Sequence, residues 1–264
     1  MRAIVAARFF RATRFLLLDF WRMQKQTWSW TSTRLSSTVA RVSRWGHYGT
    51  PILLFPTAGG DFEEVERFGL VEALKDRVES GRIKLFSVDG SAAQAWLRGT
   101  FTQPQLASQQ RAFEDFVYAE VVPLIRMDCH SPTAEIVVAG AALGGFMAVA
   151  SLCRHPDVFR SAVCMSGLVD VAQFLKDEPL TSQIESVSPL HYLPYLPEGP
   201  GLDAIRRRVI QVACGEGEYE NPVLSRQLAQ VLGGRNVPHQ LDVWGPAYSH
   251  TWNTWREMAR KYLL

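Results

Sequence analysis

From about residue 28 onward, short apolar runs alternate with longer segments in which apolar residues recur at helical spacing. This alternation predicts strands over residues 36–45, 51–55, 83–88, 134–139, 161–165, 209–213 and 240–243. It predicts helices over residues 62–79, 105–127, 145–153 and 222–232 and from Thr251 onward, with Pro123 kinking or ending the second. Short apolar strands separated by helices are typical of a mainly parallel sheet buried on both faces. We therefore expect one α/β domain over residues 28–264.

Residues 171–205 depart from this alternation because prolines recur through them. We interpret the segment as an irregular insertion over one edge of the sheet and a candidate lid.

Residues 1–27 differ from the rest in composition, since arginine and apolar residues alternate in short blocks without glycine or proline. A secretory signal fits poorly, because Asp19 interrupts the leucine run and no small-residue cleavage site follows. Residues 1–26 are compatible with a targeting peptide, with a basic amphipathic helix that contacts an anionic membrane, or with an extra helix of no functional role. No apolar run approaches the roughly 20 residues that a membrane-spanning helix needs.

Charge and cysteine content narrow the function classes. The first 30 residues hold six of the basic residues against the single Asp19, so the remainder is slightly acidic and has no basic stripe for nucleic acid. The four cysteines form no CxxC pair, which argues against both a disulfide scaffold and a structural zinc site. We expect reduced thiols, a cytoplasmic setting, and neither metal nor cofactor.

The segment EIVVAGAALGGFMAVASL, residues 135–152, predicts a strand, a tight turn and a helix. Gly140, Ala142 and Gly144 occupy the places of G-x-S-x-G, in which the central residue sits at a strained corner and its neighbours must lack bulk. Gly145 extends the close packing. A dinucleotide-binding turn is less consistent with the residues, because the G-x-G-x-x-G spacing is missing. The segment therefore predicts a nucleophile elbow that presents a methyl group.

A general base and its acid partner are expected further along the chain, in the order nucleophile, acid, histidine. His250 precedes the last predicted helix, where it could take a proton from an attacking hydroxyl. The acidic loop CGEGEYENP, residues 214–222, follows the strand 209–213; Glu218 is our choice for the acid, with Glu220 and Glu216 left open.

Two backbone N–H groups should bind the oxyanion of such a site. One would come from Leu143, and the other from Ala58 or Gly59 in the glycine-containing loop after the strand 51–55. Asp61 and Trp96 are candidates for the substrate pocket, although Trp96 could equally be a packing aromatic. Ser166 is a weak candidate for a replacement nucleophile, because it does not lie on an elbow before a helix.

Four pieces of the chain resemble a known family: FPTAGGDFEE (55–64), VVAGAALGGFMAVASLCRHPDVF (137–159), CMSGLVD (164–170) and VWGPAYSHTWNTW (243–255). In order and spacing they are similar to the putative-esterase branch of the α/β-hydrolases, which includes esterase D (S-formylglutathione hydrolase) and the antigen-85-type mycolyltransferases. The resemblance implies the α/β-hydrolase three-layer αβα sandwich and a serine carboxyl-ester hydrolase or acyltransferase. It also implies a small-molecule or lipid-like ester substrate and no metal or cofactor.

The chain departs from this family at its centre, because members carry serine where this chain has Ala142. The alanine is either an engineered replacement that inactivates the enzyme, or a native residue of a pseudo-hydrolase that binds a ligand or partner. The retained histidine and glutamates favour the engineered replacement. In both cases the chain should be nearly inactive, because loss of a triad nucleophile lowers kcat by about 10⁶.

Overall fold

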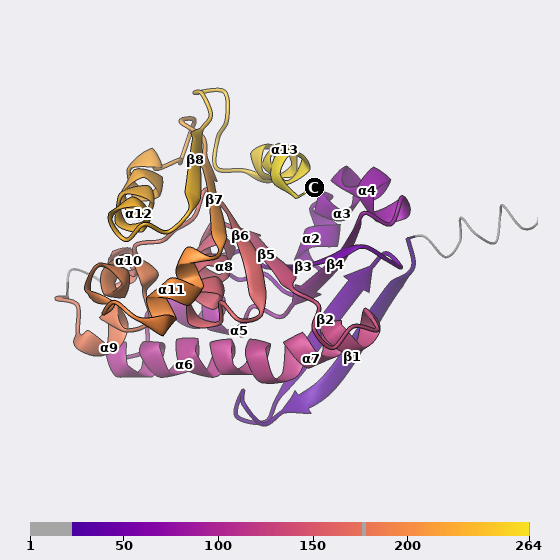
Figure 1. Ribbon diagram of the computed structural model, residues 1–264, viewed down its shortest axis with the longest axis horizontal. Coiled ribbons are helices and arrows are strands. Elements are labelled where there is room, and N and C mark those ends of the chain that lie inside the picture. The colour runs from indigo at the N-terminus through magenta and orange to yellow at the C-terminus, as the bar shows by residue number, and fades with distance from the viewer. Residues whose placement is uncertain (1–22, 176–177, 264) are drawn as a thin grey trace, which may run out of the picture.

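The computed structural model describes residues 23–175 and 178–263 (Figure 1). Eight strands form one sheet in the order β1-β2-β4-β3-β5-β6-β7-β8. They are β1 (Lys25–Ser32), β2 (Thr38–Trp45), β3 (Thr50–Phe55), β4 (Ile83–Val88), β5 (Ile136–Ala141), β6 (Phe159–Met165), β7 (Val209–Cys214) and β8 (His239–Val243). The pairs β1–β2 and β2–β4 are antiparallel, and all other pairs are parallel.

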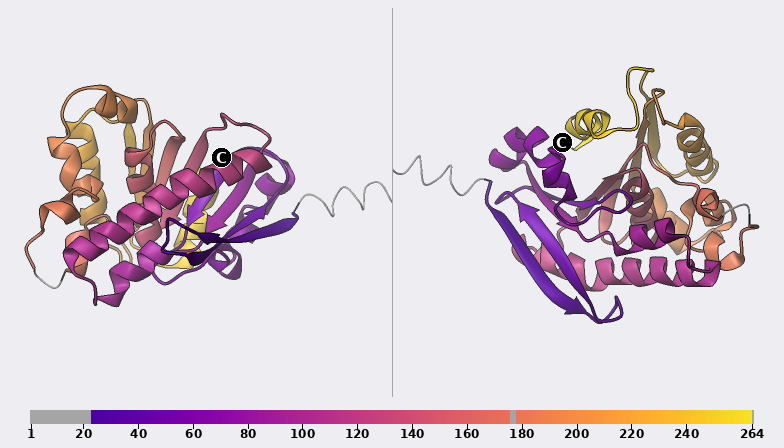
Figure 2. Two further views of the ribbon diagram at one scale, coloured as in Figure 1. Left: turned by 90° about the horizontal axis from the view of Figure 1, so that it is seen from below. Right: turned by 180° about the vertical axis from the view of Figure 1, so that it is seen from behind.

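Alternate residues of the central strands pack into two separate hydrophobic cores, one on each face of the sheet. In β3, Leu53 and Phe55 belong to the first core, whereas Ile52 and Leu54 belong to the second. The first core is covered by α5 (Ser91–Arg98), α6 (Gln103–Phe116), α7 (Val122–Asp128), α8 (Leu143–Arg154) and α12 (Pro222–Gly234). The second is covered by α2 (Glu64–Arg67), α3 (Leu70–Ala73), α4 (Lys75–Glu79) and α13 (Trp252–Tyr262). This arrangement is the predicted three-layer αβα sandwich, and Figure 2 shows the two helical layers.

The first strand lies partly inside the segment expected to be an extension. β1 begins at Lys25 and pairs with β2 along its whole length, so a boundary between residues 27 and 28 falls within a strand. Its polar sequence KQTWSWTS gives a half-exposed edge strand rather than a buried one. Residues 1–22 of the predicted extension lie outside the described residues.

Two long predicted helices are interrupted in the structure. The range 62–79 contains three short helices, α2, α3 and α4. The range 105–127 contains α6, a π-helical turn η1 (Val117–Val121) and α7. Pro123 is the second residue after this turn, and because proline has no N–H to donate, a locally widened turn accommodates it.

Residues 171–205 lie within the connection from β6, which ends at Met165, to β7, which begins at Val209. Apart from residues 176 and 177, they consist of loops and the short helices η2 (Val171–Phe174), α9 (Ser182–Glu185), α10 (Pro189–Tyr192), η3 (Leu193–Tyr195) and α11 (Pro200–Arg206). Val171, Ile184 and Leu193 are buried in the first core, and the segment contacts α6, α8 and α12. It therefore covers the first core in place of one crossover helix, and its use as a lid stays a prediction. In the part of the chain that the structure describes, no helix has the length and apolar character needed to cross a membrane.

Candidate active site

The sharp corner between β5 and α8 places Ala142 in an unusual backbone conformation. Its φ is 52° and its ψ is −121°, a region that residues other than glycine rarely occupy and that costs about 1–3 kcal/mol. The flanking glycines are required by close contact: a Cβ on Gly140 would overlap the Gly144 backbone, and one on Gly144 would lie 2.5 Å from the Phe55 carbonyl oxygen. The chain thus keeps the strained elbow geometry around a side chain that is only a methyl group.

Backbone hydrogen bonds hold this strained residue in place. The Ala142 N–H donates to the Met165 carbonyl at the end of β6 (3.0 Å). The Ala142 carbonyl accepts from the N–H groups of Leu168 (3.0 Å) and Gly145 (3.1 Å). None of these bonds uses the side chain, so the conformation does not depend on which small residue occupies position 142.

His250 lies in the loop after β8, next to a buried carboxylate. Its Nδ1 atom is 3.6 Å from Oε2 of Glu220, whose side chain is 1% exposed. The imidazole also packs edge-to-face against Trp255 in α13, with ring centres 4.9 Å apart. An imidazole held between a carboxylate and an aromatic ring has the surroundings of a general base.

Glu218 is the acid expected from the sequence, but the structure places the carboxylate of Glu220 beside His250. Glu218 is exposed and meets this region through its backbone: its carbonyl accepts from the His250 N–H (2.9 Å), and its N–H donates to Ser249 Oγ (3.1 Å). Between the two glutamates, Tyr219 has a φ of 62°, which turns the chain so that Glu220 points inward. Tyrosine is not a residue that signals this conformation, so the sequence alone does not separate the two glutamates.

The loops after β7 and β8 are joined along their backbones. The Gly217 N–H donates to the Tyr248 carbonyl (2.9 Å), and a Cβ on Gly215 would overlap the same carbonyl oxygen. This close approach explains the glycines in the acidic loop. It fixes Glu220 and His250 relative to each other.

Ser166, directly after β6, links the elbow to Glu220. Its Oγ donates to Oε1 of Glu220 (2.6 Å), and it lies between Met165 and Leu168, both of which bond to the Ala142 backbone. Ser166 is 4% exposed and its hydroxyl is bonded to Glu220 rather than to His250. This arrangement suits a residue that orients the carboxylate better than one that replaces the nucleophile.

The loop after β3 supplies the remaining candidate groups. The Gly60 N–H donates to the Thr57 carbonyl (3.1 Å), which closes a tight turn around Ala58 and Gly59. Within the described residues, the N–H groups of Leu143, Ala58 and Gly59 donate no hydrogen bond. The contact of Gly144 with the Phe55 carbonyl brings the start of α8 against this loop, so unpaired donors from two segments lie near the elbow.

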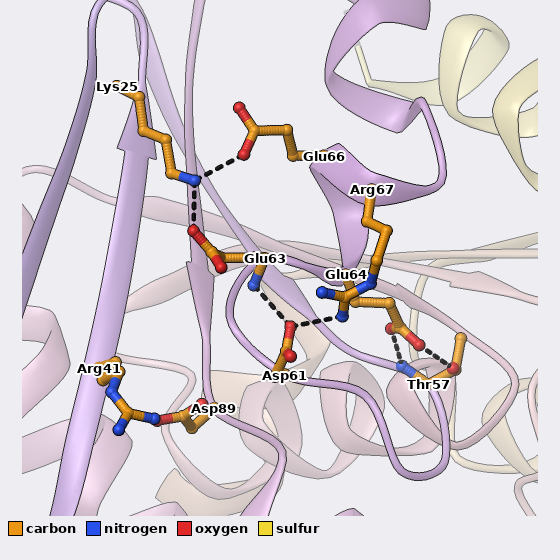
Figure 3. A network of polar contacts seen from close by, with 9 residues as sticks. All are labelled: Lys25, Arg41, Thr57, Asp61, Glu63, Glu64, Glu66, Arg67 and Asp89. Carbon is orange, nitrogen blue, oxygen red and sulfur yellow. Dashed lines mark hydrogen bonds and ion pairs between the residues drawn. The ribbon is translucent and has the colours of Figure 1, made fainter.

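The two expected pocket residues have other roles in the structure. Trp96 is 2% exposed, donates to Gln110 Oε1 (3.1 Å) and packs on Phe146, so it is a buried core residue. Asp61 accepts from the Glu63 N–H (2.9 Å) and from Arg67 (2.8 Å), which fixes the start of α2 (Figure 3). The neighbour of Trp96, Leu97, is exposed, and its Cδ1 lies 3.9 Å from the position of a Cβ on Gly59.

Comparison with known proteins places this chain in a family. The family model for putative esterases matches residues 63–264. No curated protein matches the chain in sequence.

Solved structures show the same fold at low identity. A ferulic acid esterase superposes with a TM-score of 0.71 at 19% identity, covering 92% of this chain and 97% of that one. An S-formylglutathione hydrolase from Agrobacterium tumefaciens gives 0.69 at 13% identity, covering 92% and 94%. MPT51 (FbpC1) of Mycobacterium tuberculosis gives 0.61 at 15% identity, covering 89% and 95%. The chain has an α/β-hydrolase fold and belongs to the putative esterase family.

Proposed function

We propose that this chain carries the site of a serine-type carboxyl-ester hydrolase in which alanine replaces the nucleophile. The observation that carries the proposal is the backbone of Ala142, which keeps a φ of 52° and a ψ of −121° although a methyl group gains nothing from it. Such strain persists where a function uses it, because a relaxed turn would be more stable. The His250–Glu220 pair supports the same interpretation.

With a serine at position 142, the reaction follows from the groups around the elbow. The serine Oγ attacks the ester carbonyl carbon while His250 takes its proton, and the N–H groups of Leu143 and of Ala58 or Gly59 stabilise the oxyanion. Glu220 stabilises the imidazolium. Collapse of the tetrahedral intermediate breaks the bond to the alkoxy oxygen, which receives the proton from His250 and leaves as an alcohol. Water then repeats the sequence on the acyl-enzyme and releases the acid.

With Ala142 in place, no acyl-enzyme can form, and the chain binds an ester without turning it over. Turnover should be lower by about 10⁶ than in the serine form. Exposed apolar side chains near the loops, Leu97 beside Gly59 and Phe68 stacked on Trp252 (ring centres 4.9 Å apart), favour an ester with an apolar part, either a small molecule or a lipid.

The experiment is to introduce Ala142→Ser and to assay both chains against p-nitrophenyl esters of increasing acyl length. The proposal predicts a gain of several orders of magnitude that is abolished by adding His250→Ala. A folded Ala142→Ser protein without any gain contradicts it and favours a natural pseudo-hydrolase that binds a ligand or partner. Transfer of the acyl group to an added alcohol in preference to water identifies an acyltransferase.

A further inference from the structure

A buried carboxylate outside the His250–Glu220 pair is bonded to the loop after β3. Glu64, the first residue of α2, is 4% exposed. Its Oε2 atom accepts from the Thr57 N–H (2.7 Å), and its Oε1 atom accepts from the Thr57 hydroxyl (2.5 Å). Both oxygens of one buried acid are thus engaged by a single residue, the one directly before Ala58 (Figure 3).

The shape of the loop fits this carboxylate closely. A Cβ on Gly60 would overlap the carboxyl group of Glu64, so the turn of residues 57–60 wraps around it. On the other side, a Cβ on Gly90 would lie 2.8 Å from the Gly60 carbonyl oxygen. The loop is therefore held between the Glu64 carboxylate and the backbone at the end of β4, with little room to change shape.

Glu64 is in turn fixed to the sheet through α2. Lys25 of β1 forms ion pairs with Glu63 (2.5 Å) and Glu66 (2.6 Å), and Asp61 bonds to the Glu63 N–H and to Arg67 (Figure 3). Because these contacts surround the start of α2, the helix can hold its first residue in a constant position relative to β3.

We propose that Glu64 is a positioning residue for the oxyanion-binding loop, and that its bonds to Thr57 keep the Ala58 and Gly59 N–H groups directed at the reacting carbonyl. This inference rests on the proposed function. The Thr57 N–H bonds to Glu64, whereas the Ala58 and Gly59 N–H groups donate no hydrogen bond within the described residues. The Glu64 carboxylate therefore occupies the Thr57 N–H, whereas the N–H groups of Ala58 and Gly59 stay available for an oxyanion. Preorganised donors of this kind stabilise the transition state more than the bound substrate.

The chemistry of the contact distinguishes two substitutions. A glutamine at position 64 can accept from the Thr57 N–H with its oxygen and donate to the Thr57 hydroxyl with its amide, because a hydroxyl both donates and accepts. Glu64→Gln should keep the loop in place, whereas Glu64→Ala removes both bonds. Glu72→Ala is the matched control, since Glu72 lies on the neighbouring helix α3 with its side chain 72% exposed.

The test combines two measurements on these variants. In the parent chain, hydrogen exchange of the Thr57 amide is followed by NMR; in the Ala142→Ser background, kcat and KM are measured on an aryl ester. We expect Glu64→Ala to accelerate Thr57 exchange about tenfold or more and to lower kcat by about 10–100-fold, with KM changed less than about threefold. Glu64→Gln and Glu72→Ala should stay within about threefold in every quantity. Should Glu64→Ala fail to fold, Thr57→Val, which removes only the hydroxyl bond, should lower kcat by about 3–10-fold.

The outcomes separate the inference from the proposed function. Unchanged exchange in Glu64→Ala overturns the inference, as does faster exchange without any loss of kcat. A rise in KM with an unchanged kcat also overturns it, because that pattern shows a role in substrate binding alone. An inactive Ala142→Ser protein contradicts the proposed function and with it the catalytic part of the inference, while the exchange data still decide whether Glu64 orders the loop.

Discussion

Oε2 of Glu220 lies 3.6 Å from Nδ1 of His250, and the two residues belong to loops that follow the neighbouring parallel strands β7 and β8. Parallel strands carry their carboxyl ends to one edge of the sheet, so loops after adjacent strands meet there. The glycines that let these two loops touch also bring Glu220 next to His250.

The first prediction concerns which glutamate serves His250. In the Ala142→Ser background, Glu220→Gln should lower kcat by about 10²–10⁴, because the imidazolium loses its carboxylate partner. Glu218→Gln is the matched control and should leave kcat within about threefold, since Glu218 contributes its backbone to the contact with His250. Steady-state kinetics on an aryl ester measures both, and a larger loss in Glu218→Gln than in Glu220→Gln would reverse the assignment.

Ser166 is predicted to orient the acid. Ser166→Ala removes the 2.6 Å bond to Oε1 of Glu220 and leaves a buried carboxylate oxygen with one partner fewer. We expect a loss of about 1–3 kcal/mol in the free energy of unfolding and a fall in kcat of about 5–50-fold in the Ala142→Ser background. Chemical denaturation and kinetics are the two measurements. Complete loss of activity in the variant, with its stability unchanged, would instead make Ser166 a nucleophile.

The elbow depends on the absence of a side chain at Gly144. Gly144→Ala places a Cβ 2.5 Å from the Phe55 carbonyl oxygen and 2.6 Å from that of Pro56. Since neither backbone can move freely, we expect the free energy of unfolding to fall by about 1–3 kcal/mol or more. Gly234→Ala, at the end of α12, is the control: a Cβ there meets nothing within 4 Å, so stability should stay equal or rise slightly. Equal denaturation midpoints for the two variants would show that the elbow can relax.

Asp242 should make stability depend on acid pH. Lys261 (2.6 Å) and Tyr262 (2.5 Å) of α13 donate to its Oδ2 atom, and these hydrogen bonds hold the pKa of Asp242 below its ordinary value of 3.8. The folded state therefore binds fewer protons than the unfolded state in this range, and the stabilisation is complete above pH 3.8 and is lost as the pH falls through the lowered pKa.

The corresponding experiment compares the parent chain with Asp242→Asn by thermal unfolding between pH 7 and pH 2. The variant should be less stable by about 1 kcal/mol at pH 7, a figure discounted for solvent screening, and the difference should shrink below pH 4. If the difference in stability between the two proteins stays constant with pH, the charge of Asp242 does not contribute to the stability of the fold.

Much of the fold could be predicted from the sequence because the central strands are continuous apolar runs. The range predicted for β4 agrees with the structure to the residue, and the glycine spacing around Ala142 correctly indicates a strand, a turn and a helix. β1 is missing from the prediction because it is an exposed edge strand, and its polar-rich sequence lacks the apolar run that marks a buried strand. The helix over Ser91–Arg98 is missing because it spans only eight residues, so its helical spacing of apolar residues covers little more than two turns.

The details of the site depend on contacts between residues that are not adjacent in the chain, and short sequence patterns do not predict such contacts. Glu220 turns inward because Tyr219 adopts a positive φ, and Glu64 meets Thr57 because the intervening loop folds back on itself. Leu97, rather than the neighbouring Trp96, lies beside Gly59, because the course of α5 turns Trp96 into the core. Each of these outcomes follows from the path of a loop, which tertiary packing decides.

The central claim is most directly tested by covalent capture at position 142. The Ala142→Ser protein is incubated with a p-nitrophenyl alkylphosphonate and digested, and the modified peptide is identified by mass spectrometry, with the parent chain and Ala142→Ser/His250→Ala treated in parallel. We predict that the phosphonyl group is found on the introduced serine, with release of p-nitrophenol, and that both controls stay unmodified on the experimental time scale. Modification at another residue, or none in a folded Ala142→Ser protein, would contradict the assignment of this elbow as an esterase site.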